Sequence, residues 1–179
     1  MIREKFMRSS LRSSLISARI LLAAVWASLC LSMIAAPLLS ARGCEPAATL
    51  LYLFFSPVCH QVPERSFLIS GHAWAVCHRC AGIYFGLLLA AVSGNLFIGR
   101  FLQARRSWAL AASLPLLLDA LLPHAGLWNS SGTSRFLSGA LFGIMASSLL
   151  VLGVTELLQE APWRRCLSRI PHFKEAVHE

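Results

Sequence analysis

The chain has 179 residues, of which 56% are apolar and 13% are charged, and its mean hydropathy is +0.64. A soluble domain carries about 25% charged residues, so this composition predicts an integral membrane protein with no separate soluble domain. The formal net charge of +8 does not indicate nucleic-acid binding, because no stacking aromatic residues are interleaved with the basic ones. We expect the lipid bilayer to be the partner of this chain, and no nucleic acid.

The first part of the chain predicts one anchor helix and one short helix. Residues 1–18 are rich in Arg and Ser and read as a basic cytoplasmic lead-in. The apolar run at 20–40 exceeds the 7–15 residues of a signal-peptide core, which favours a retained membrane anchor. The run at 47–58 is shorter than the roughly 20 residues that a spanning helix needs, so we expect a re-entrant or interfacial helix there. Residues 66–76 read as a mixed loop.

Three more apolar segments predict spanning helices at residues 81–99, 107–122 and 136–157. The expected fold class is therefore all-α, an integral membrane bundle of about four spanning helices plus the short helix. A single bundle domain would cover residues 19–157, with a Cys/His hairpin at 59–80 and a basic cytoplasmic tail at 158–179.

Positive charges predict the orientation of this bundle. With four spans, twelve of the 16 Lys and Arg residues fall on the side of the two termini and four on the other side. A fifth span at 47–58 would leave eight on each side. Since cytoplasmic loops are enriched in Lys and Arg, the four-span topology places both termini in the cytoplasm and residues 59–80 at the outer face.

Soft metal ligands are concentrated in the 59–80 hairpin. Cys77 and Cys80 are separated by two residues, a spacing that lets both thiolates reach one ion, and Cys59 and His60 could complete a four-ligand zinc site. Because the side chains of neighbouring residues diverge, His72, His78 or water could take the place of His60.

Two alternatives to a metal site use the same cysteines. Cys77 and Cys80 open the predicted 81–99 helix, an arrangement that lowers the pKa of a thiol, so the first alternative is a membrane thiol–disulfide oxidoreductase that uses these two cysteines. A structural disulfide or metal clip that only pins the hairpin to the bundle is the second alternative. The sequence has no nucleotide-binding loop, no Ser-His-Asp layout and no transport repeat, so it leaves open whether the protein is an enzyme.

Asp119 is the only aspartate of the chain and lies inside the predicted 107–122 span. An ionisable residue within a span is costly and marks a functional site by default, although a structural ion pair is equally consistent. The candidate partners on the same side are Arg65, Arg79 and Arg135.

Two pairs of glycines four residues apart predict close helix packing. Gly82 and Gly86 lie on one face of the second span, and Gly139 and Gly143 lie on one face of the fourth. Such pairs let two backbones approach closely, so these two spans are expected to pack together.

The two halves of the hairpin resemble the signature of a family of predicted prokaryotic membrane proteins, described as a domain of unknown function. That signature is close to Cys-His-Gln-x-Pro-x-Arg-Ser followed by Cys-x-Arg-Cys-x-Gly-Ile-Tyr-x-Gly, and the resemblance covers roughly residues 48–145. His78 departs from the pattern, as does the missing Gly-x-x-Gln stretch after Asp119. The resemblance implies a prokaryotic cytoplasmic membrane protein and supports an architecture and a site without implying a reaction. The residues that match are Cys59, His60, Gln61, Pro63, Arg65, Ser66, Cys77, Arg79, Cys80, Gly82, Ile83, Tyr84 and Gly86, and then Pro115, Asp119, Arg135, Gly139 and Gly143.

Overall fold

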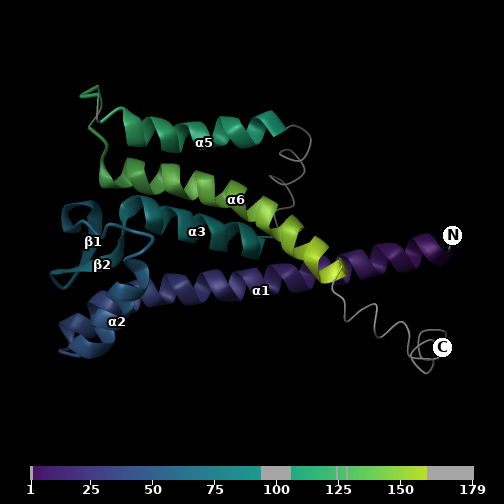
Figure 1. Ribbon diagram of the computed structural model, residues 1–179, viewed down its shortest axis with the longest axis horizontal. Helices are drawn as coiled ribbons and strands as arrows, with labels where there is room; N and C mark the ends of the chain where they lie inside the picture. Colours follow the sequence, from purple (N-terminus) through teal and green to yellow (C-terminus); the bar gives the residue numbers. More distant parts are fainter. Residues whose placement is uncertain (1, 94–105, 124, 128, 161–179) are drawn as a thin grey trace.

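The computed structural model describes residues 2–93, 106–123, 125–127 and 129–160 (Figure 1). Long helices dominate this part of the chain, and α2 and a small β-hairpin lie together at one end of them (Figure 1). The long helices are α1 (Ile2–Ala41), α3 (His78–Ser93), α5 (Arg106–Leu121) and α6 (Gly132–Glu160). The short elements are α2 (Glu45–Phe55), the 3₁₀ turn η1 (Pro63–Arg65), β1 (Ser66–Ile69) and β2 (His72–Cys77).

The prediction of an all-α fold is wrong at residues 66–77, which form an antiparallel hairpin and not a loop. Ser66 pairs with Cys77, and Ile69 pairs with His72. The turn is made by Ser70 and Gly71, whose φ angles of 52° and 82° are both positive, as a two-residue hairpin turn requires. This short hairpin carries one of the three cysteines at its end and so matters for the site.

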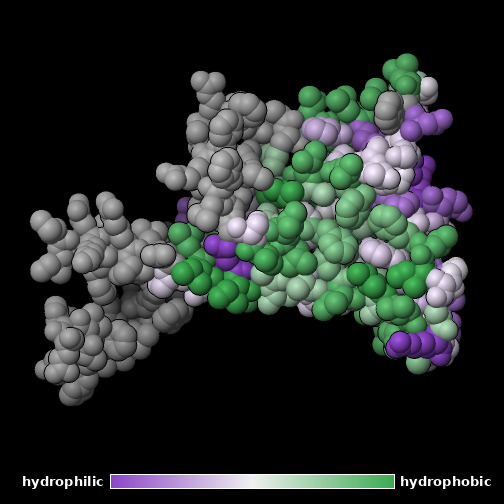
Figure 2. All heavy atoms as spheres, turned by 180° about the vertical axis from the view of Figure 1, so that it is seen from behind, coloured by the Kyte–Doolittle hydropathy of each residue, from purple (hydrophilic) through white to green (hydrophobic). Residues whose placement is uncertain are grey.

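Two of the described helices are candidate membrane spans. Ser13–Ala41 and Gly132–Leu157 are long and apolar enough to cross a bilayer, by length and composition. The described parts of α3 and α5 have 16 residues each, or about 24 Å of helix, which is less than the roughly 30 Å of a hydrocarbon core. Residues 94–99 of the second predicted span and most of the 158–179 tail lie outside the described residues. Apolar residues cover the middle of the face in Figure 2, and polar ones gather at the hairpin end.

The packing of α3 on α6 confirms the glycine prediction. A Cβ atom at Gly82 would overlap the carbonyl oxygen of Phe136, and one at Gly143 would overlap that of Ile83. Gly86 and Gly139 are equally tight against the opposite backbone. The order of these contacts along both helices makes α3 and α6 parallel, so both begin at the hairpin end.

Arg19 joins α1 to the other end of α3. Its Nε donates a hydrogen bond to the carbonyl oxygen of Ala91 (3.3 Å), and its guanidinium also reaches the carbonyl oxygen of Val92. These carbonyls lie in the last turn of α3, where the helix dipole favours a cation. The bundle is therefore fastened by a basic residue at the end that lies away from the hairpin.

Candidate metal centre and its cavity

The structure brings together three cysteines from three different segments. Cys59 follows α2, Cys77 ends β2, and Cys80 lies in the first turn of α3. Their Sγ atoms all lie within 4.8 Å of one another, and the backbone N–H of Cys77 donates a hydrogen bond to Cys59 Sγ (3.2 Å). The spacing of the three cysteines in the sequence does not by itself bring their sulfur atoms together. Their approach depends on how the hairpin folds back against α2.

Gln61 holds the hairpin in that position. Its side-chain amide donates hydrogen bonds to the carbonyl oxygens of Tyr52 in α2 (2.7 Å) and Ala75 in β2 (2.8 Å). The Tyr52 hydroxyl donates a further bond to the carbonyl oxygen of Ala73. Gln61 itself has a φ of 52°, which turns the chain sharply just after Cys59. Gln61 was not predicted from the sequence to have a role, and its place in the family signature was the one available signal.

Apolar side chains close the inner side of the cysteine cluster. Cys59 is buried and packs in a core with Met33, Phe55 and Val76, each of which is almost fully buried. Cys77 and Cys80 are half-buried at the edge of this core. Among the described residues, the three sulfurs are therefore covered by apolar side chains on their inner side.

The three sulfurs are close enough to share protons. Hydrogen bonds from the Cys59 and Cys80 thiols lower the pKa of the Cys77 thiol well below its usual range. Three thiolates this close repel one another strongly in a partly buried site, so a cation is needed before all three can ionise. The cluster is thus a ready ligand set for a soft metal.

The geometry fits zinc. A Zn–S bond of about 2.3 Å in a tetrahedron places sulfurs about 3.8 Å apart. The Sγ atoms, which lie within 4.8 Å of one another, would need to close by about 1 Å or less. Side-chain rotation alone supplies such a movement.

The histidines that the sequence offered as ligands are not part of this cluster. His60 is exposed and lines the cavity beside the sulfurs without belonging to the group of converging atoms. His72 begins β2, at the far end of the strand from Cys77. The ring of His78 packs edge-on against Phe67, with ring centroids 4.4 Å apart.

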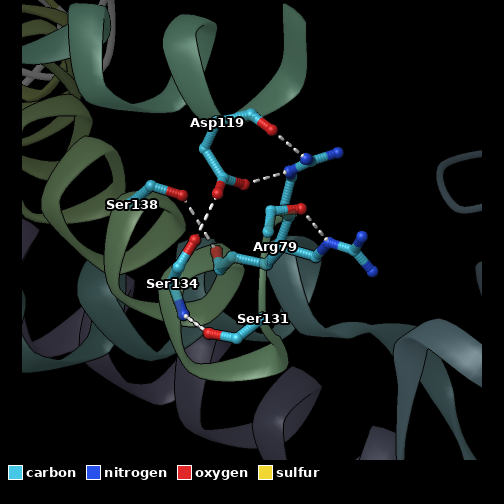
Figure 3. Close-up of polar contacts among 7 residues, drawn as sticks. Arg79, Asp119, Ser131, Ser134 and Ser138 are labelled. Carbon is cyan, nitrogen blue, oxygen red and sulfur yellow. Dashed lines mark hydrogen bonds and ion pairs between the residues drawn. The ribbon is translucent and has the colours of Figure 1, made fainter. Parts of the chain in front are cut away.

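Asp119 forms a buried ion pair with Arg79. Its side chain is 7% exposed, and its Oδ2 accepts a hydrogen bond from Arg79 Nε at 2.9 Å. The guanidinium of Arg79 also donates to the carbonyl oxygen of Asp119, and the Ser134 hydroxyl donates to Oδ1 (Figure 3). Of the three arginines proposed as partners, the structure selects Arg79. The role of Ser134 was not recognised in the sequence.

A cavity of about 320 Å³ opens beside the cysteines. Its wall carries all three sulfur residues and three arginines, which come from η1, α3 and α6. Arg79 lies one helical turn before Gly82, and Arg135 lies one turn before Gly139, so the close glycine contact brings these two arginines to the same cavity. The residues lining the cavity are Val58, Cys59, His60, Val62, Arg65, Cys77, Arg79, Cys80 and Arg135.

Comparison with known proteins finds relatives over the segment that holds this site. A sequence model of a family described as "Predicted membrane protein (DUF2085)" matches residues 59–149, about half of the chain. An uncharacterized protein of Methanocaldococcus jannaschii is 36% identical over 95 residues, which span 52% of this chain and 61% of the relative. An uncharacterized protein of Methanothermobacter thermautotrophicus is 33% identical over 90 residues, which span 50% of this chain and 81% of the relative. No solved structure matches.

Proposed function

The chain belongs to the DUF2085 family of predicted membrane proteins, and we propose that it binds zinc through Cys59, Cys77 and Cys80 at the outer boundary of the membrane. The observation that carries this proposal is the convergence of three Sγ atoms, each within 4.8 Å of the other two. A disulfide bond would involve only two of these sulfurs, whereas a metal ion can be coordinated by all three.

A zinc ion held by these three cysteines would have a fourth coordination position, and the cavity that the cysteines line would give other ligands access to it. Water or the imidazole of His60, which lines the same cavity, would complete the tetrahedron. Three protein ligands and one exchangeable ligand are typical of zinc sites that do chemistry or bind a further molecule, while closed four-residue sites are structural. The zinc ion would also tie the segment after α2 to the start of α3.

The zinc proposal is tested by elemental analysis of the full chain purified in detergent. We expect one zinc per chain in the natural protein and loss of zinc in Cys77→Ser/Cys80→Ser. Cys44→Ser is the matched control, because Cys44 is an exposed free cysteine outside the cluster and the cavity. Zinc-free natural protein, or zinc retained after both substitutions, would refute the proposal.

A membrane thiol–disulfide oxidoreductase is the second candidate, supported by the lowered pKa of Cys77 beside Cys80 in the first turn of α3. It predicts a protein without zinc in which Cys77 and Cys80 form a titratable disulfide that exchanges electrons with a quinone. A purely structural clip is the third candidate, and it predicts a less stable fold when both cysteines are removed. Unchanged folding together with an unchanged cell phenotype would remove function from the site altogether.

For the topology, we propose a single bundle over residues 19–157 with four spans, both termini in the cytoplasm and the hairpin outside the cytoplasmic membrane of a prokaryote. The parallel arrangement of α3 and α6 supports it, since the second and fourth spans of such a bundle run in the same direction. Labelling intact cells with a membrane-impermeant maleimide tests it. Cys44, exposed between α1 and α2, should react from outside, and protection until the cells are opened would refute the orientation.

A further inference from the structure

The cavity beside the cysteines collects more positive charge than the protein neutralises. Arg65, Arg79 and Arg135 all line it. Arg79 has a carboxylate partner in Asp119, whereas neither Arg65 nor Arg135 has one within the described residues. Arg135 donates a hydrogen bond to the neutral hydroxyl of Ser130 (2.7 Å), and its repulsion by Arg65 and Arg79 exceeds its attraction to Asp119 and Cys77.

The formal charges around the cavity sum to a positive value, so the cavity lacks negative charge. Three guanidinium groups and the Asp119 carboxylate leave two positive charges. A zinc ion with three thiolates carries one negative charge, so the loaded site would still hold one positive charge. Charges at the edge of an apolar bundle are weakly screened and interact strongly, so a bound monoanion would relieve the repulsion among the arginines.

We propose that this cavity binds a phosphate group, held by Arg65 and Arg135 and facing the fourth coordination position of the zinc. The inference rests on the proposed zinc centre for its charge balance. Guanidinium groups pair with phosphate oxygens in two-pronged hydrogen bonds. Three arginines that reach one cavity from three elements suit a tetrahedral group with several oxygens better than a carboxylate, which offers two oxygens in one plane.

Two sources can supply this group at a membrane boundary. The phosphodiester of a lipid headgroup is a monoanion and is present at the predicted depth of the hairpin, and inorganic phosphate is the soluble source. The cavity of about 320 Å³ has a volume at the lower end of the range for small-ligand sites.

The test uses the full chain, loaded with zinc, in a maltoside detergent that carries no phosphate. Inorganic phosphate and short-chain phosphatidylglycerol are titrated separately, with binding followed by native mass spectrometry and zinc content measured on each sample. The variants are Arg65→Gln, Arg65→Gln/Arg135→Gln and the charge-preserving Arg65→Lys/Arg135→Lys. Arg42→Gln is the control, since Arg42 is exposed and lies outside the cavity.

We expect one of the two probes to bind, which identifies the source. Each Gln substitution should weaken that binding by about tenfold or more, the effect of losing one charge-assisted hydrogen bond. The Lys variant should retain part of the affinity, and Arg42→Gln should retain all of it, with zinc content equal throughout. Arg65 is exposed in a short turn, so Arg65→Gln remains informative if the double variant does not fold.

The phosphate proposal is overturned if zinc-loaded protein binds neither probe, or if binding is equal in the natural chain and in Arg65→Gln/Arg135→Gln. Arginine-dependent binding by a chain that never holds zinc would refute the zinc centre and support the phosphate site. The two proposals can therefore fail separately.

Discussion

Replacing Asp119 by Asn removes the negative charge that balances Arg79. The Asp119 side chain is 7% exposed and that of Arg79 is 23% exposed, so the remaining guanidinium would stay largely shielded from water beside two other arginines. The amide oxygen of Asn can still accept the Ser134 hydrogen bond. We therefore expect a loss of about 3 kcal/mol in the free energy of unfolding, the lower end of the range for breaking a buried pair.

The assay is reversible unfolding in mixed micelles followed by circular dichroism, with zinc content measured on the folded fraction. Arg79→Gln/Asp119→Asn is the matched variant, because it removes both charges together. It should be more stable than Asp119→Asn by about 1–2 kcal/mol, the size of coupling between residues in contact. Zinc per folded chain should stay equal to that of the natural protein.

A loss below about 1 kcal/mol, the typical contribution of an exposed pair, would contradict the description of this ion pair as buried. No recovery in the double variant would show that Asp119 does not act through Arg79. A loss of zinc from the folded fraction would instead connect Asp119 to the metal centre.

Other substitutions test the packing, the hairpin and the thiols separately. Gly82→Leu should lower the free energy of unfolding by about 2 kcal/mol through overpacking. Gly153→Leu is the control and should leave the free energy of unfolding unchanged in the same assay, because there is open space around Gly153. Gln61→Ala removes the two hydrogen bonds by which Gln61 joins α2 to β2 and should lower the free energy of unfolding by about 2 kcal/mol. It should also weaken zinc binding, measured by competition titration. An unchanged zinc affinity would exclude a positioning role for Gln61. In zinc-free protein, the lowered pKa of Cys77 keeps its thiolate present as the pH falls. Iodoacetamide should therefore still alkylate Cys77 at pH 6, where an added cysteine-containing peptide, whose thiol has an ordinary pKa of about 8.5, reacts slowly. Equal pH profiles for Cys77 and the peptide would contradict the hydrogen-bonded thiolate.

The helical part of the fold was accessible from the sequence because apolar runs and glycine spacing are local signals. The bounds of α5 agree with the predicted 107–122 segment to one residue, whereas α6 (Gly132–Glu160) extends beyond the predicted 136–157 segment at both ends. The contact of Gly82 and Gly139 with the opposite helix is confirmed. The β-hairpin was missed because its strands have only four and six residues. Ser70-Gly71, the turn signal between them, was not recognised.

The site was predictable in its chemistry and less so in its geometry. Cys77 and Cys80 are near in sequence, but Cys59 reaches them through hydrogen bonds that Gln61 makes across 14 residues. The choice of Arg79 as the partner of Asp119 depends on how α3 and α5 each pack against α6, which no local pattern specifies. The shared cavity of cysteines and arginines likewise appears only when five segments are assembled.

The glycine contact between α3 and α6 also has a consequence for the width of the cavity mouth. Arg79 and Cys80 belong to one of these helices and Arg135 to the other. A methyl group at Gly82 or Gly139 would force the backbones apart and carry Arg135 away from the sulfurs. Because each glycine has only a hydrogen atom in place of a side chain, these positions set the distance between the two helices at the cavity mouth. Substitutions there would therefore change the size of the molecules that can enter the cavity, although the substituted residues would not contact those molecules.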